Sequence, residues 1–171
     1  MTIEYLANLA EIAGGIMIVG GAIFGLVQLR ELKQQRMNSV ASDLMKTFYS
    51  THLSRAVSMI HELPDGITGA ELRAKGQEYE QAAVLVSTTF ETMGLLVFEG
   101  IAPYRLVQQL AGGMIGSMWR KLHVWTDELR AEQSQPSWGE WFQWVAEQME
   151  KTKQETAPAY VEYANQASRF G

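Results

Sequence analysis

The longest apolar segment of the chain extends from Ile12 to Leu29 and contains no charged residue. As a helix, these 18 residues span about 27 Å at ~1.5 Å per residue, close to the ~30 Å hydrocarbon core of a bilayer. Gln28 is their only strongly polar member. The pattern predicts a transmembrane anchor over residues 1–30, and the alternative is a buried core helix of a soluble protein.

Charges on either side of this segment predict its orientation. Residues 1–29 contain Glu4 and Glu11 but no Lys or Arg, whereas Arg30, Lys33 and Arg36 follow the apolar segment directly. Basic residues mark the cytoplasmic side of a membrane helix. A cleaved signal peptide has its basic residues before the apolar run and a small-residue cleavage site after it. We therefore expect an uncleaved single-pass anchor with the N-terminus outside and the following domain in the cytoplasm.

Three glycines of the anchor fall on one helix face, because Gly14, Gly21 and Gly25 are separated by seven and four residues. Gly21 and Gly25 form a GxxxG element, which lets two membrane helices approach closely. This face is the predicted site of homo-oligomerisation. Glycine is also common in membrane helices that do not associate.

Beyond the anchor, apolar residues recur at helical spacing, and no run alternates as strands do. The sequence therefore predicts an all-α cytosolic bundle over residues 31–155 and a C-terminal tail over 156–171, frayed or forming a short helix. The first helix should continue past Arg30 as a stalk. Its apolar stripe comprises Met37, Val40, Leu44 and Phe48.

Turn and cap residues predict the limits of the later helices. A second helix should begin near Thr51 and end before Pro64, and Thr68 and Glu71 have the spacing of a capping box. The next helix should extend from this box to about Phe98, with Gly100 as its stop. A further helix is expected from Pro103 to about Arg130, with a break at Gly112–Gly113. The last should extend to about Lys151 and begin at a second capping box formed by Ser137 and Glu140.

The segment from Ala82 to Phe98 is apolar enough to resemble a second span. Glu91 near its middle and four hydroxyl residues make insertion close to break-even, so a core helix of the bundle is the better interpretation. A carboxylate in that setting needs a partner. The candidate partners of Glu91 are Arg105, Arg120 and Lys121.

Composition limits the chemistry that the chain can perform. The 171 residues carry a net charge of −5, which disfavours nucleic-acid binding, and the absence of cysteine excludes thiol chemistry and Cys-ligated metals. His52, His61 and His123 match no metal motif, and Gly112 to Ser117 lacks the lysine of a phosphate-binding loop. We expect no catalytic residue, no cofactor, no metal and no enzymatic activity.

Aromatic residues crowd the segment of the second capping box. Trp138, Trp141 and Trp144, together with Phe142 and Val145, place apolar side chains on more than one face of the predicted helix. A bundle core is the preferred interpretation. The alternatives are a surface that docks a protein partner, since tryptophan is enriched in interface hot spots, and a helix lying on the membrane surface.

Four strings resemble a family of small bacterial membrane-anchored proteins known only as a domain of unknown function: GGAIFGLVQLRELKQQR, TFETMGLLVFEGIAP, SMWRKLHVWTDELRAEQ and WGEWFQWVAEQME. The resemblance extends from the anchor to about Met149. It implies a bacterial inner-membrane protein with one N-terminal anchor, and it implies no catalytic residues.

Together these patterns favour a non-enzymatic protein that is held in the bacterial inner membrane by contact with lipid. We expect it to act as an oligomeric scaffold or to recruit a protein partner. The alternative function is a subunit of an ion- or solute-conducting membrane assembly.

Overall fold

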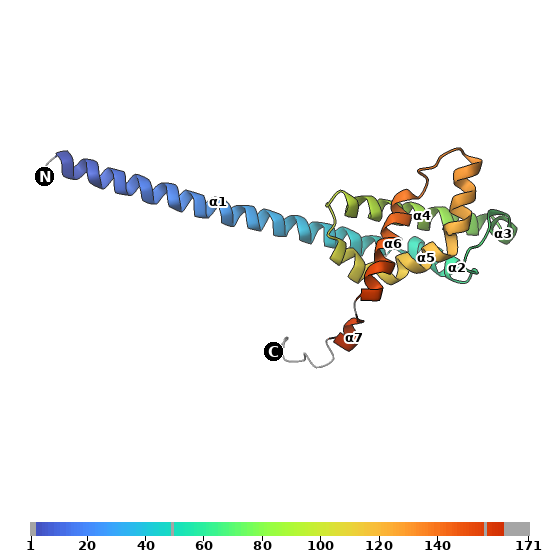
Figure 1. The fold of residues 1–171 in the computed structure, drawn as a ribbon. Helices are drawn as coiled ribbons and strands as arrows, with labels where there is room; N and C mark the ends of the chain where they lie inside the picture. The colour runs from blue at the N-terminus through green and yellow to red at the C-terminus, as the bar shows by residue number, and fades with distance from the viewer. Residues whose placement is uncertain (1–2, 49, 156, 163–171) are drawn as a thin grey trace. The chain divides into compact units, whose positions relative to one another are not determined.

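A computed structural model describes residues 3–48, 50–155 and 157–162, and all regular secondary structure within these ranges is helical (Figure 1). The all-α prediction is therefore confirmed for the described chain. The helices are α1 (Ile3–Phe48), α2 (Thr51–His61), α3 (Gly69–Lys75), α4 (Gln77–Phe98), α5 (Tyr104–Glu132), α6 (Glu140–Glu155) and α7 (Ala159–Glu162).

The chain divides into two compact units, residues 1–42 and 43–171. The first unit consists of α1 up to Ser42, so the predicted helix continues without a break past Arg30. The predicted boundary after residue 30 marks where the apolar segment ends, whereas the boundary after residue 42 separates two compact units. The two boundaries therefore describe different properties of the chain. Of the predicted tail, residue 156 and residues 163–171 lie outside the described chain, and α7 is a short helix after Pro158.

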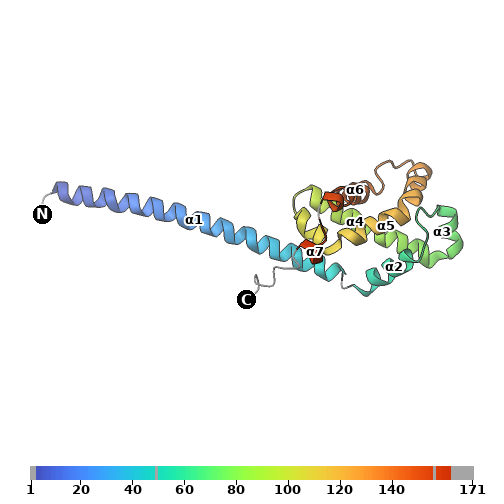
Figure 2. The same ribbon diagram turned by 60° about the horizontal axis from the view of Figure 1, so that its bottom comes forward.

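In the second unit, α4 contacts α2, α3, α5 and α6. Figure 2 shows α2 and α6 on different sides of α4. The predicted place of this helix inside the bundle is confirmed, because its inner face is buried. The largest fully buried side chains of this core include Phe90 and Met93 of α4, Ile60 of α2, Ile115 and Leu122 of α5, and Phe142 of α6.

Two predicted helix limits are confirmed by their hydrogen bonds. The Thr68 hydroxyl accepts from the Glu71 N–H at 3.3 Å, and the Glu71 carboxylate accepts from the Thr68 N–H at 3.0 Å, which completes the first capping box. The Thr68 N–H and the Thr68 hydroxyl both donate to the Glu71 carboxylate, and these two bonds lower the pKa of Glu71 below its ordinary value. At the end of α4, the Ile101 N–H donates to the Leu96 carbonyl and the Gly100 N–H to the Val97 carbonyl, the two bonds of a Schellman motif.

Two glycine predictions are wrong. The helix expected from Thr68 to Phe98 is broken at Gly76, whose φ of 109° lies outside the range that other residues adopt readily. The break expected at Gly112–Gly113 is absent, because α5 is continuous through both residues. A Cβ on Gly112 would lie 3.3 Å from the Met149 sulfur, so this glycine allows α5 and α6 to pack closely.

The second predicted capping box does not form as expected. Residues 136–139 form turns, and α6 begins at Glu140, so Ser137 is two residues too early to cap it. Gly139, with a φ of 66°, directly precedes the helix. Trp138 consequently lies in the turn before α6 and does not belong to the helix that carries Trp141 and Trp144.

The closest approach of α4 to α6 generates a stability prediction. A Cβ on Gly94 would lie 2.2 Å from the Trp141 carbonyl oxygen, and backbone cannot move away as a flexible side chain can. Gly94→Ala should therefore destabilise the full-length chain by at least about 1–3 kcal/mol. Gly113→Ala is the matched control, because nothing lies within 4 Å of the added methyl group and alanine favours helix by about 1 kcal/mol. Thermal unfolding followed by circular dichroism should show a lower midpoint for the first variant only; equal midpoints would contradict the close contact.

Candidate functional site

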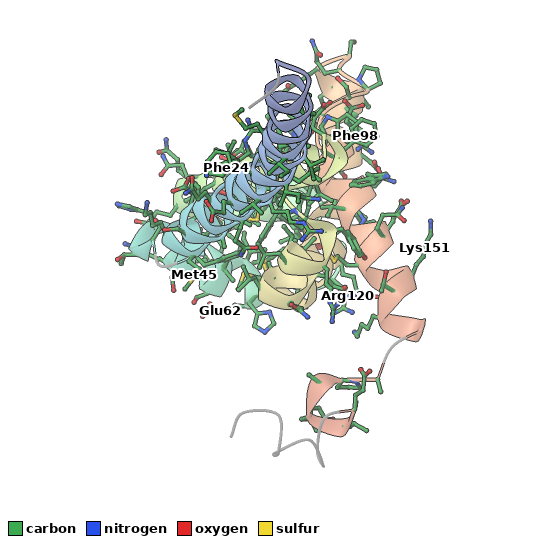
Figure 3. All side chains as sticks on the ribbon, turned by 90° about the vertical axis from the view of Figure 1, so that its left-hand side faces the viewer. Phe24, Met45, Glu62, Phe98, Arg120 and Lys151 are labelled. Atoms are coloured by element: carbon green, nitrogen blue, oxygen red, sulfur yellow. The ribbon has the colours of Figure 1, made fainter. Side chains whose placement is uncertain are left out.

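An aromatic patch joins the last turn of α4 to the first half of α6. The Phe98 ring centroid lies 4.3 Å from that of Trp141 and 5.7 Å from that of Trp144, and the two indoles are 6.3 Å apart. Phe98 is 54% exposed, and both indoles are half-buried. Figure 3 shows Phe98 beside α6. We call Phe98, Trp141 and Trp144 the aromatic patch.

Apolar surface extends beyond these three rings. Leu95 and Ile101 near the same end of α4 are also exposed. A groove of 320 Å³ borders the patch and is lined in part by Tyr104 and Thr152. The polar tip of Tyr104 is satisfied, because its hydroxyl donates to the Gln148 carbonyl at 2.9 Å. No charged residue or histidine lines this groove, whose lining combines apolar side chains with uncharged polar ones.

The structure divides the predicted tryptophan surface. Trp141 and Trp144 belong to the aromatic patch, whereas Trp138 lines a different cleft. The backbone of Trp138 is fixed there, since the Arg130 guanidinium donates to its carbonyl at 2.7 Å. Sequence reasoning missed Phe98 as the third ring of the patch. The available signal was a large apolar residue in the last turn of a helix whose glycine stop had been identified.

Glu91 has a partner, but it is none of the three cations considered. Its carboxylate accepts from the Phe142 N–H in the first turn of α6 at 2.7 Å. The first N–H groups of a helix have no partner within the helix and lie at the positive end of its dipole, so a carboxylate stabilises them well. Lys121 and Arg120 instead pair with Asp65, and the bond from Lys121 lowers the pKa of that carboxyl group.

A second carboxylate acts in the same way. Glu128 is half-buried and accepts from the Gly69 N–H at the start of α3. Its neighbour Asp127 is exposed and pairs with Arg130.

The glycines predicted to mediate oligomerisation lie together on α1. A Cβ added to Gly14, Gly21 or Gly25 would meet nothing within 4 Å in this single chain. Among the described residues, no group of three or more His, Asp or Glu side chains is placed to hold a metal ion. The features of the described surface that bear on function are the glycine face of α1 and the aromatic patch.

Comparison with known proteins identifies one related family. A family model described as a domain of unknown function (DUF4760) matches residues 15–149, most of the chain. No curated protein and no solved structure matches. The match ends at the residue where the resemblance of the sequence strings was expected to end.

The contact of Glu91 with α6 leads to a second stability prediction. Glu91→Gln keeps a hydrogen-bond acceptor but removes the charge at the helix N-terminus, so the free energy of unfolding should fall by about 1 kcal/mol. Glu150→Gln alters an exposed carboxylate of α6 and should change the free energy of unfolding by less than about 0.5 kcal/mol. Thermal unfolding of both full-length variants measures the difference, and an unchanged midpoint for Glu91→Gln would show that α6 does not need this carboxylate.

Proposed function

The chain belongs to the DUF4760 family of unknown function, and we propose that it is a single-pass, membrane-anchored helical module of the bacterial inner membrane. It self-associates through its anchor and recruits a protein partner through its helical domain. The role is one of binding, because the aromatic patch carries no charged or nucleophilic group.

The observation that carries this proposal is the exposure of apolar side chains along α1. Ile16 is 67% and Phe24 65% exposed, and none of the apolar window of this helix is buried. Exposed apolar helix surface is unfavourable in water, and lipid removes that cost. This exposure counts against the alternative of a core helix. By contrast, α4 is also long and apolar enough to span a membrane, but 44% of its window is buried among neighbouring helices.

Two sequence features support the details of this arrangement. Arg30, Lys33 and Arg36 after the span favour a cytoplasmic helical domain. The GxxxG element formed by Gly21 and Gly25 favours close contact between anchors. A conducting assembly is less well supported, because Gln28 is the only strongly polar residue between Ile12 and Leu29 that could line a pore.

The aromatic patch is the face proposed for a protein partner. Tryptophan and phenylalanine bury large areas at low conformational cost, which is why tryptophan is enriched in interface hot spots. The rings are already packed on one another at 4.3–5.7 Å, so a partner would meet an ordered surface.

The proposed topology predicts the result of reporter fusions in bacteria. A fluorescent protein that matures only in the cytoplasm should be active when fused after Phe48, and alkaline phosphatase, which requires the periplasm, should be inactive there. Changing Arg30, Lys33 and Arg36 to Gln removes the basic cluster and should produce mixed orientation. Phosphatase activity in the unaltered chain would overturn the orientation, and a full-length chain recovered without membrane would overturn the anchor.

The proposed oligomer contact predicts the effect of a bulky side chain on the glycine face. Gly21→Ile should reduce crosslinking between full-length chains in membranes severalfold, because it separates the two backbones. Gly20→Ile adds the same side chain roughly 120° away from the centre of that face and should leave crosslinking unchanged. Equal crosslinking of both variants would place the contact elsewhere on the chain.

A further inference from the structure

A polar cleft of 390 Å³ separates the middle of α4 from the connection between α5 and α6. Residues that line it and matter for its chemistry are Ser87, Glu91, Gln133, Gln135, Ser137 and Trp138. The cleft is distinct from the groove beside the aromatic patch, with which it shares no lining residue. Glu91 is the one charged residue among those that line it.

Ser87 is the first unusual feature of the cleft. It is only 3% exposed, and its hydroxyl has no hydrogen-bond partner among the described residues. The threonines of α4 behave differently, because Thr88, Thr89 and Thr92 each donate to the carbonyl four residues earlier. A buried polar group without a partner is costly, and such groups are rare in folded proteins.

Trp138 provides a second unpartnered group at the same cleft. Its indole N–H is buried and has no acceptor among the described residues. Local disorder does not explain this, since the Trp138 carbonyl accepts from Arg130 and its backbone N–H donates to the Gln135 carbonyl at 3.1 Å. The side chain is thus held at the cleft wall with an unused donor.

The connection that borders the cleft begins with a helix cap. Ser134 has a φ of 53° and lies between two residues that line the cleft. Its N–H donates to the Ala131 carbonyl at 3.4 Å and the Gln135 N–H donates to the Arg130 carbonyl at 3.0 Å, which are the two bonds of a Schellman motif at the end of α5. This φ is therefore the left-handed conformation of an ordinary helix cap, and the two unpartnered groups carry the inference.

From these observations we infer that the cleft binds a small, neutral, hydroxyl-bearing molecule such as a monosaccharide or a cyclic polyol. The indole N–H requires an acceptor, and the Ser87 hydroxyl can donate or accept. The Glu91 carboxylate already accepts from the Phe142 N–H and can accept from a further donor. A hydroxyl group is both donor and acceptor, so one ligand of this class satisfies all three. An anion is disfavoured by Glu91 and by the absence of Lys or Arg from the lining.

The size of the cleft agrees with this ligand class. A volume of 390 Å³ falls within the range of small-molecule sites and far exceeds the ~30 Å³ that one water molecule occupies in the liquid. Ser87 and Trp138 are shielded from bulk water. Changes of side-chain rotamer on binding are common, and the inference requires such a change to bring both buried groups to the surface of the cleft.

The test measures binding to the full-length chain in detergent micelles, with glucose and myo-inositol as neutral probes and inorganic phosphate as the anionic control. Saturation-transfer NMR should detect a neutral probe with a roughly millimolar dissociation constant, as expected for about a dozen heavy atoms. Ser87→Ala and Trp138→Phe should each weaken binding about tenfold. Ser117→Ala, outside the cleft, is the matched control and should bind normally.

Thermal unfolding without probe separates a binding role from a structural one. Ser87→Ala should unfold at the same or a higher temperature than the unaltered chain, because it removes an unsatisfied buried hydroxyl group and leaves almost no cavity. The inference is overturned if neither neutral probe binds at a concentration of about 10 mM, or if phosphate binds in their place. It is also overturned if the variants bind normally, or if Ser87→Ala lowers the unfolding temperature, which would mean that this hydroxyl already has a partner in the fold.

Discussion

The backbone contact between α4 and α6 is the constraint on which the helical unit depends. Gly94 lets the Trp141 carbonyl approach to a distance that no side chain permits, and one turn earlier Glu91 binds the Phe142 N–H. The first contact is steric and the second electrostatic, yet they act on adjacent residues of α6. Together they fix both how close α6 lies to α4 and where it begins. The buried rings of Phe90 and Phe142, 5.4 Å apart, fill the space beneath.

Helical content and several helix ends were predictable because their causes are local. The Thr68 and Glu71 pair and the stop at Gly100 depend on residues within a few positions of one another. The effects of glycine were not predictable in this way. Gly76 separates two helices, whereas Gly112 lies inside one. Met149 of α6 lies close to Gly112, and nothing lies within 4 Å of a Cβ added to Gly76. Tertiary packing therefore decides what local sequence leaves open.

The candidate site shows the same division between local and distant causes. The pairing of Trp141 with Trp144 follows from their spacing of three on one helix. Phe98 comes from a different helix, and no periodicity connects it to them. Trp138 was grouped with its neighbours because a local cap at Ser137 was expected, and the later start of α6 separates it from them. The glycine face of α1 could be identified from spacing alone, because it involves only one helix.

Two carboxylates bind helix N-termini from distant parts of the chain: Glu91 takes the place of a local cap at α6, and Glu128 adds to the local capping box of α3. Glu91 and Glu128 accept N–H groups that are 51 and 59 residues away in the chain. Since Glu91 stabilises the start of α6, residues 133–139 need not adopt the geometry of an N-cap. They bend instead into turns that hold Trp138 at the cleft wall. The Glu91 carboxylate positions α6 and is also an acceptor for a ligand. A ligand that donates to Glu91 in the cleft therefore shares this carboxylate with α6, the helix that carries Trp141 and Trp144. Cleft and patch are thus joined through one side chain.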